Sequence, residues 1–305
     1  MIKSLLIGGL LATSSVAIAQ ERPGPPQVLM VKPLRGGAYW IEGGRANTGF
    51  IVGKTSVIVI DAEMSPDMVK QELAAIAKLT DKPISTIIVT HADPDHVAGV
   101  PLYPAAARLI EHENTWSEVV ASSNDPTGGP LTSVYKRVVT HKPSHTIAGN
   151  ETVTLDGVRI QLIHIAPAHT SGDLIVYLPA QKIVYAGDVV TTNLGRFPVI
   201  HFGGSSLGWI ATMKAMLALD ATTYVGGHGS LETKAQLEAR VHDAEERRAA
   251  VKTMVEQGKS LSDVETALPE PGANPMFFSF TRTVFDELTK GYPPASPPWT
   301  NIVKH

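Results

Sequence analysis

The sequence predicts a globular α/β domain in which short strands and longer helices alternate. Runs of four to six apolar, β-branched residues recur between glycines, as in packed strands, and Ser56–Ile60 is one example. Capped stretches with apolar residues at helical spacing lie between them. The chain has 305 residues and is 43% hydrophobic, so it can bury a sizeable core.

Composition excludes several classes of function. The formal net charge is −3. The chain therefore lacks the excess of basic residues that would indicate a nucleic acid or an anionic membrane as its partner. The chain contains no cysteine, which rules out disulfides, thiolate metal ligands, iron–sulfur clusters and cysteine nucleophiles.

Residues 1–19 are typical of a secretory signal peptide. Lys3 precedes an apolar run that ends in Ala17-Ile18-Ala19, and polar residues follow at once. The run is shorter than the roughly 20 apolar residues that span a bilayer. We therefore expect cleavage after Ala19, a periplasmic or secreted protein, and no membrane insertion after cleavage.

The first half of the chain predicts an irregular lead-in, four strands and a helix. Residues 20–36 are rich in proline and glycine and predict an irregular lead-in, and residues 37–305 predict a single domain with helices at its C-terminal end. Ser65-Pro66-Asp67 predicts a helix start, with a cap, a proline in the first turn and an acid near the positive helix end. The predicted strands are Ala38–Ile41, Thr48–Val52, Ser56–Ile60 and Ile84–Val89.

The second half predicts two hairpins followed by helices. Asp156-Gly157 between two β-branched runs is a strong two-residue hairpin signal. The hairpin strands are Thr152–Leu155 with Val158–Ile165, and Leu174–Leu178 with Lys182–Tyr185. Next come a core helix at Leu207–Leu219, a strand at Thr222–Val225, helices at Leu231–Gln257 and Asn274–Leu288, and a surface tail at Pro293–Pro298.

Four apolar strands are each followed by a loop that carries histidine or aspartate. The loops contain His91-Ala92-Asp93-Pro94-Asp95-His96, His169-Thr170-Ser171-Gly172-Asp173, Gly187-Asp188 and Gly227-His228-Gly229. Imidazole and carboxylate suit zinc, iron or manganese, and strand ends hold ligands rigidly. These donors are too many for one tetrahedral ion but about right for two ions that share a bridging carboxylate.

The order and spacing of these loops, with Asn47-Thr48-Gly49 before them, resemble the metallo-β-lactamase superfamily. The resemblance implies a four-layer αβ/βα sandwich with a dinuclear metal site at one edge of two sheets. It places His91 and His169 on a first metal and Asp95, His96 and His228 on a second. Asp188 matches the bridging carboxylate and stands where cysteine-bearing lactamases have cysteine, which is closer to the glyoxalase II, lactonase and phosphodiesterase branches.

The second histidine of the family's His-x-His-x-Asp-His loop is Asp93 here. An oxygen ligand at this position favours iron or manganese over zinc at the first site. Alternatively, Asp93 does not bind, and the second site dominates. We expect two zinc ions, with iron or manganese as the alternative that Asp93 introduces.

The resemblance implies an exported hydrolase in which a metal-bound hydroxide attacks an ester, lactone, thioester or amide bond of a small molecule. Asp95 would orient the hydroxide and carry its proton. One alternative is a non-haem iron dioxygenase similar to persulfide dioxygenases, with iron on His91, His169 and Asp188. The other is a non-catalytic periplasmic metal-binding protein, for which Asp93 is the only sequence sign.

The remaining polar residues receive simpler interpretations. Thr90, Thr170 and Asp61 are candidates to support the ligands. His201 follows the third loop and is a candidate substrate contact. We interpret His164 and Asp173 as structural, Trp209 and Tyr224 as core, and His112, His141, His145, His242 and His305 as surface histidines.

Overall fold

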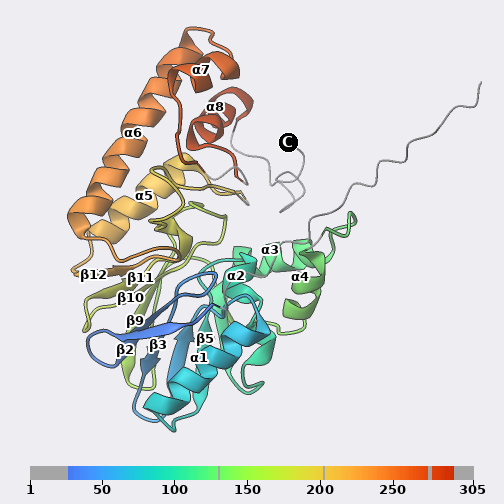
Figure 1. Cartoon of the computed structure of the whole chain (residues 1–305), viewed down its shortest axis with the longest axis vertical. Coiled ribbons are helices and arrows are strands. Elements are labelled where there is room, and N and C mark those ends of the chain that lie inside the picture. Colours follow the sequence, from blue (N-terminus) through green and yellow to red (C-terminus); the bar gives the residue numbers. More distant parts are fainter. Residues whose placement is uncertain (1–26, 130, 202, 274–276, 292–305) are drawn as a thin grey trace, which may run out of the picture.

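The computed structural model describes residues 27–129, 131–201, 203–273 and 277–291 (Figure 1). The predicted signal peptide with its cleavage after Ala19, the tail at Pro293–Pro298 and His305 lie outside the described residues. None of the helices within the described ranges combines the length and the apolar character needed to cross a membrane.

The described strands form two sheets. The first has the order β1-β2-β3-β4-β5-β6-β7, with antiparallel pairs as far as β4 and parallel pairs from there on. The second has the order β12-β11-β10-β9-β8 and is antiparallel except for the pair β11 and β12. The strands are β1 (Met30–Pro33), β2 (Ala38–Glu42), β3 (Thr48–Val52), β4 (Val57–Ile60), β5 (Ile84–Ile88), β6 (Arg108–His112), β7 (His145–Ile147), β8 (Glu151–Leu155), β9 (Val158–Ile163), β10 (Ile175–Leu178), β11 (Ile183–Tyr185) and β12 (Thr223–Val225).

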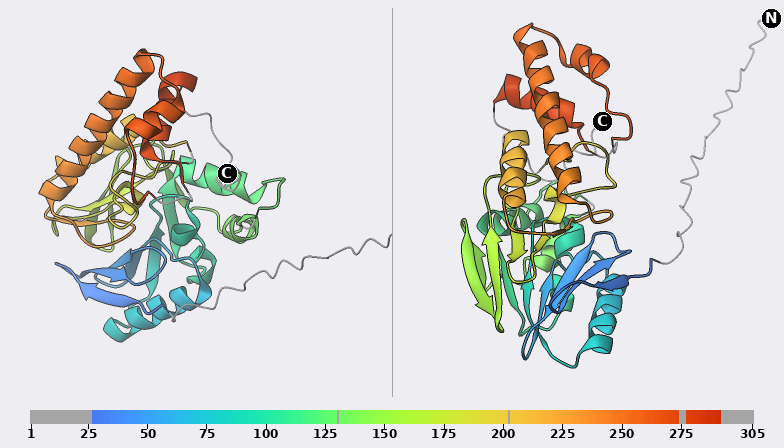
Figure 2. Two further views of the ribbon diagram at one scale, coloured as in Figure 1. Left: turned by 45° about the horizontal axis from the view of Figure 1, so that its top comes forward. Right: turned by 90° about the vertical axis from the view of Figure 1, so that its left-hand side faces the viewer.

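Helices cover the outer faces of both sheets, from α6 at the top of Figure 1 to α1 at the bottom. The two helical layers lie at opposite ends of the molecule in the other views as well (Figure 2). The helices are α1 (Pro66–Leu79), α2 (Pro94–Val97), α3 (Glu113–Ser123), α4 (Thr132–Val138), α5 (Ser206–Leu217), α6 (Lys234–Glu256), α7 (Leu261–Ala267) and α8 (Phe280–Lys290).

Strand β4 shows how the first sheet is buried on both faces. Val57 and Val59 pack in a core with Ile76 of α1, whereas Ile58 and Ile60 pack between the two sheets. Successive side chains of a strand point to opposite faces, so a fully apolar strand fits only where both faces are covered.

Strand β10 of the second sheet is likewise buried on both faces. Ile175 and Tyr177 pack in the outer core with Trp209 of α5, and Val176 and Leu178 face the first sheet. The layers are therefore helix, sheet, sheet and helix. This arrangement confirms the predicted four-layer αβ/βα sandwich.

Most predicted elements are present within one to three residues, and two predictions need correction. The lead-in is not irregular throughout, because Met30–Pro33 forms strand β1 against β2. The last helix begins at Phe280 and not at Asn274, because the side chain of Ser279 caps it by accepting from the backbone N–H of Arg282. Strands β6 and β7 and helices α2, α3, α4 and α7 were not predicted.

Candidate metal centre

The ends of parallel strands bring the candidate ligands to one edge of the two sheets. His91 follows β5 in the first sheet, while Asp188 follows β11 and His228 follows β12 in the second. Parallel neighbours end at the same edge, so loops that are distant in sequence meet there. His169 reaches the same place from the loop between β9 and β10.

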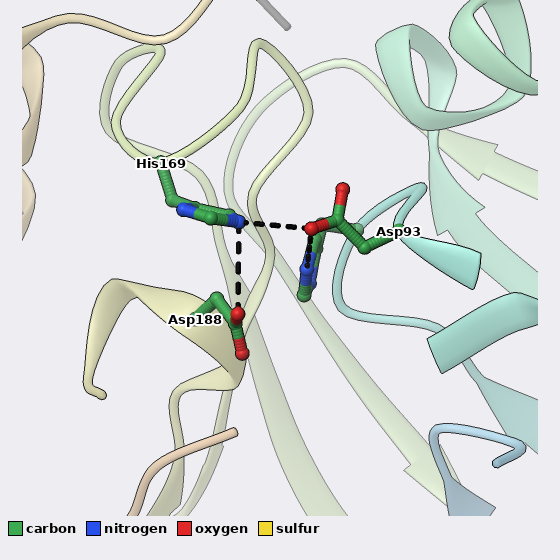
Figure 3. A group of neighbouring side chains, drawn as sticks. Asp93, His169 and Asp188 are labelled. Atoms are coloured by element: carbon green, nitrogen blue, oxygen red, sulfur yellow. Dashed lines mark hydrogen bonds and ion pairs between the residues drawn. The ribbon is translucent and has the colours of Figure 1, made fainter. Parts of the chain in front are cut away.

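A first group of four buried side chains could hold one metal ion. One donor atom each from His91, Asp93, His169 and Asp188 lies within 4.8 Å of the others. The Nε2 atom of His169 is 3.2 Å from Oδ2 of Asp93 and 3.7 Å from Oδ2 of Asp188. Figure 3 shows the imidazole facing both carboxylates. The Nε2 atom of His91 is 3.6 Å from the same Asp93 oxygen.

A second group consists of Asp95, His96 and His228, again with donor atoms within 4.8 Å of one another. The Nε2 atom of His228 lies 3.4 Å from Oδ2 of Asp95. Asp95 and His228 are partly exposed, whereas His96 is fully buried. This second group is therefore the one that faces solvent.

Asp188 lies between the two groups. Its Oδ1 atom is 3.2 Å from Nε2 of His96, and its Oδ2 atom is 3.2 Å from Nε2 of His228. The same Oδ2 atom faces His169 of the first group. A carboxylate in this position could be shared by two neighbouring ions.

Hydrogen bonds at Nδ1 orient the imidazole rings of the signature loop. Nδ1 of His91 lies 3.0 Å from Oγ1 of Thr90, and Nδ1 of His96 lies 2.8 Å from Oδ2 of Asp61. Asp61 also accepts a bond of 2.9 Å from the Thr90 hydroxyl. These contacts leave Nε2 of both rings directed at the centre, as partners of metal-ligating histidines do.

The loop that carries His169 is held in a different way. Nδ1 of His169 donates to the carbonyl oxygen of Val199 at 2.8 Å. The carboxylate of Asp173 accepts from the backbone N–H groups of Thr170 at 2.8 Å and Ala168 at 3.2 Å. Asp173 is thus structural, as expected, and Thr170 contacts this aspartate rather than the imidazole.

The carboxylates and imidazoles shift each other's protonation. Burial opposes a charge on His169, but Asp93 and Asp188 raise its pKa to about 9. Burial also opposes a charge on His228, which Asp188 and Asp95 overcome, raising its pKa to about 10. Burial favours the neutral form of Asp188, yet His228 and His96 hold its pKa well below the usual range. The carboxylates therefore keep their negative charge and attract cations.

The donor set fits a metal ion. Among the described residues, Nε2 of His91, Oδ1 of Asp93, Nε2 of His96 and Oδ1 of Asp188 are buried and make no hydrogen bond. Buried polar atoms without hydrogen bonds are costly, and cations bound at the two groups would satisfy these four. Imidazole nitrogens with carboxylate oxygens suit zinc, iron and manganese.

Two contacts at the centre were missed from the sequence. Asn47 donates from Nδ2 to the carbonyl oxygens of Gly226 at 2.9 Å and Gly229 at 2.8 Å, which fixes the loop of His228. His201, expected as a substrate contact, places its Nε2 atom 3.0 Å from Oδ2 of Asp93. No local spacing indicates either contact, because each joins segments more than 100 residues apart.

The expectation that His112 is a surface residue is wrong. Its side chain is buried, and its ring stacks on that of His164 with centroids 3.9 Å apart. It caps α3 by accepting from the backbone N–H of Asn114 at 3.1 Å. Burial, aided by His164, lowers its pKa to about 4. The burial follows from strand β6, which the sequence did not reveal.

A small cavity of about 100 Å³ lies between residues 194–199 and residues 269–271 and 277–280, and the four residues of the first group are not part of its lining. It is lined by apolar and aromatic side chains together with Arg196, Arg247 and Glu270. Val199, which accepts the hydrogen bond from His169, belongs to this lining. Phe277 also belongs to it, and its ring centroid is 5.6 Å from that of His201.

Comparison with known proteins agrees with this arrangement. The model of the Metallo-beta-lactamase superfamily matches residues 41–228. The 2,4-dinitroanisole O-demethylase subunit alpha of Nocardioides sp. (strain JS1661) is 32% identical over 203 residues, which are 66% of this chain and 57% of that protein. The linear primary-alkylsulfatase of Pseudomonas sp. (strain ATCC 19151) is 24% identical over 210 residues, which are 57% of this chain and 39% of that protein.

The chain thus spans about half the length of these curated relatives. Among solved structures, the stereoselective inverting sec-alkylsulfatase Pisa1 from Pseudomonas sp. superposes with a TM-score of 0.66 at 13% identity. The superposition covers 90% of this chain and 52% of that chain. It therefore includes helices that lie beyond the region of the family match.

Proposed function

Because this chain belongs to the metallo-beta-lactamase superfamily, we propose that it is a metal-dependent hydrolase with a dinuclear centre. The observation that carries the proposal is the position of Asp188, which meets both His96 and His228 on one side and His169 on the other. A bridging carboxylate between two complete donor groups is what a two-ion hydrolytic site requires.

The two donor groups would hold one ion each. His91, Asp93 and His169 form one set, Asp95, His96 and His228 form the other, and Asp188 is shared. Bound there, two divalent ions supply Lewis acidity and lower the pKa of a water molecule. Each set has two imidazoles and one carboxylate, a mixture that suits zinc, and the carboxylate of Asp93 in place of a third imidazole makes iron or manganese a fitting alternative at the first set.

Asp95 is the residue of the chain that would accept and hold a proton during hydrolysis. Asp95 is partly exposed, and its Oδ2 atom lies beside His228. Burial raises the pKa of Asp95, but His228 and His96 bring it below the usual value. Asp95 is therefore ionised near neutral pH, and its oxygen can accept a proton from the attacking group and orient it.

We propose that the substrate is a small molecule with an ester-type bond. The ester, lactone, thioester and amide classes remain the first choices, and the relatives add two more. One relative is named for removing a methyl group from an aryl ether and another for cleaving alkyl sulfates. The cavity beside Val199 and Phe277 offers an apolar wall for the part of the substrate that does not react.

We also propose that the protein is exported through an N-terminal signal peptide. Residues 1–19 would be removed after Ala19, so the hydrolase would act in the periplasm or outside the cell. Mass spectrometry of the protein purified from a periplasmic fraction tests this directly. A mature chain that begins at Gln20 is the expected result, and an intact Met1 in the cytoplasmic fraction would contradict it.

The function is tested by metal stoichiometry together with hydrolysis. We expect two ions per chain by elemental analysis and turnover of at least one lactone, thioester, alkyl sulfate or nitroaryl ether. His96→Ala and Asp188→Ala should abolish turnover without unfolding the chain, whereas His242→Ala, on the exposed face of α6, should not. A single iron with oxygen uptake would favour the dioxygenase, and no bound metal would favour a non-catalytic role.

A further inference from the structure

We propose that His201 is a ligand of the first metal ion, in the place of the imidazole that position 93 lacks. The proposal rests on the dinuclear centre proposed above. In the family's loop two imidazoles precede the second-site ligands, but here one of them is replaced by the shorter carboxylate of Asp93. The ring of His201 contacts this carboxylate, although His201 lies 108 residues further along the chain.

The distances around His201 are those of ligands that share one ion. Its Nε2 atom lies 3.0 Å from Oδ2 of Asp93 and 3.1 Å from Nε2 of His169, and those two atoms are 3.2 Å apart. Donors about 2.1 Å from an ion are about 3.4 Å apart in a tetrahedral arrangement and about 3.0 Å apart at the right angles of an octahedral one, so the observed spacings suit an ion with five or six donors. The three atoms form a compact triangle that one ion can cap.

The hydrogen bond at Nδ1 of His169 fits this arrangement. This Nδ1 atom faces the carbonyl oxygen of Val199, which can only accept a hydrogen bond. When a metal ion takes the place of the proton on Nε2, His169 keeps its other proton on Nδ1, bonded to Val199, and offers the lone pair of Nε2 to the ion. That lone pair points into the same small space as Nε2 of His201 and the carboxylate oxygen of Asp93.

The backbone joins His201 to His169, so the two rings are positioned as a unit. The backbone N–H of His201 donates to the carbonyl oxygen of His169 at 2.8 Å, and Gly204 closes the turn by donating to His201 at 2.8 Å. The two rings meet edge to face, with centroids 4.4 Å apart and planes at 89°. Backbone hydrogen bonds of this kind keep two candidate ligands at a fixed separation.

The test measures metal binding without reference to turnover. Full-length wild type, His201→Ala, Asp93→Ala, the double variant and the surface control His242→Ala are loaded with Co²⁺. Affinity is measured by competition with a chelator, and coordination by visible absorption. Loss of a supporting residue costs 10–100-fold in affinity, so we expect His201→Ala to weaken one ion by about 100-fold or more. The other ion and the His242→Ala control should be unchanged.

The double variant separates a ligand from a residue that merely positions Asp93. If His201 binds the ion itself, His201→Ala weakens binding further in the Asp93→Ala background. If it acts only through Asp93, the double variant matches Asp93→Ala, and the proposal is overturned. His201→Gln is the second variant should His201→Ala fold poorly, and an unaltered cobalt spectrum there would also overturn it.

The same experiment distinguishes this proposal from the proposed function. Two ions in wild type with unchanged affinity in His201→Ala would remove only the role of His201. A wild-type chain that binds no divalent ion would overturn both. The spectrum of His96→Ala, which removes a ligand of the second set, identifies which ion each variant has lost.

Discussion

The Oδ2 atom of Asp61 lies 2.8 Å from Nδ1 of His96, and both side chains are buried. Asp61 holds this position with a φ of 63°, in the left-handed region that few non-glycine residues adopt. Its other oxygen accepts the backbone N–H of Thr90 at 2.8 Å. One strained residue thus fixes the imidazole of one candidate ligand and the backbone that precedes another.

Asp61→Asn should weaken metal binding at the second set of donors. Asparagine tolerates the left-handed backbone, so the turn is retained, but its amide offers Nδ1 of His96 weaker or opposing hydrogen bonding. Loss of such a partner typically costs about 10–100-fold in affinity. Chelator competition measures the change, with Asp67→Asn in the exposed first turn of α1 as the control. Equal affinities would show that Asp61 serves the fold alone.

Gly227→Ala should disable the bridge between the two donor groups. A Cβ atom at position 227 would lie 1.9 Å from Oδ1 of Asp188, so the carboxylate must move. Displacements of about 1 Å at a reacting centre can cost on the order of 100-fold in rate. We expect a loss of this size in turnover, together with fewer than two ions per chain.

Gly149→Ala is the matched control for that substitution. A Cβ atom there meets nothing within 4 Å, so the same chemical change is made in open space. Stability, metal content and turnover should all remain at the wild-type level. Full activity in Gly227→Ala as well would mean that Asp188 need not hold its observed position.

Asp93→His should shift the metal preference of the first set toward zinc. The substitution exchanges an anionic oxygen for an imidazole nitrogen, which zinc accepts more readily than manganese does. The protein is loaded from an equimolar mixture of Zn²⁺ and Mn²⁺ and analysed for bound metal. The same ratio in variant and wild type would show that Asp93 is not a ligand.

His112→Asn should make the protein less sensitive to acid. The pKa of His112 is about 4 in the fold and 6.5 ordinarily, so the unfolded chain binds more protons between these values. Its contribution to stability is complete above pH 6.5 and is lost as the pH falls toward 4. Each pKa unit corresponds to about 1.4 kcal/mol, and we expect a loss of roughly 1–2 kcal/mol between pH 7 and pH 5.

Asparagine suits this test because it keeps the acceptor that caps α3 but does not titrate. Urea unfolding of both proteins at pH 7, 6 and 5 gives the difference. Parallel pH dependence in wild type and variant would contradict the assignment to His112. Titration of the histidines at the metal centre affects both proteins alike and cancels in the comparison.

Much of the candidate centre could be predicted because its donor residues follow strands in short, distinctive loops. His91, Asp95 and His96 lie within one six-residue segment, and their joint placement needs only a strand followed by a turn. The Asp156-Gly157 hairpin was predicted for the same reason, since a two-residue turn is encoded locally.

The buried ring of His112 and the capped start of α8 were not predictable in this way. His112 ends β6, which pairs with β5 and β7, and nothing near it in sequence marks it as buried. The helix at the C-terminal end begins where Ser279 caps it, and the apolar residues before it gave no sign of a later start.

The sequence by itself determined most of the strands and helices, the superfamily and the six candidate positions that match its motifs, because alternation, capping and loop spacing act over a few residues. Only the tertiary structure decided that Asp188 meets both donor groups and that His201 reaches Asp93 and His169. Those contacts depend on how two sheets and their connecting loops pack. The packing is set by apolar burial across the whole chain and leaves no local pattern.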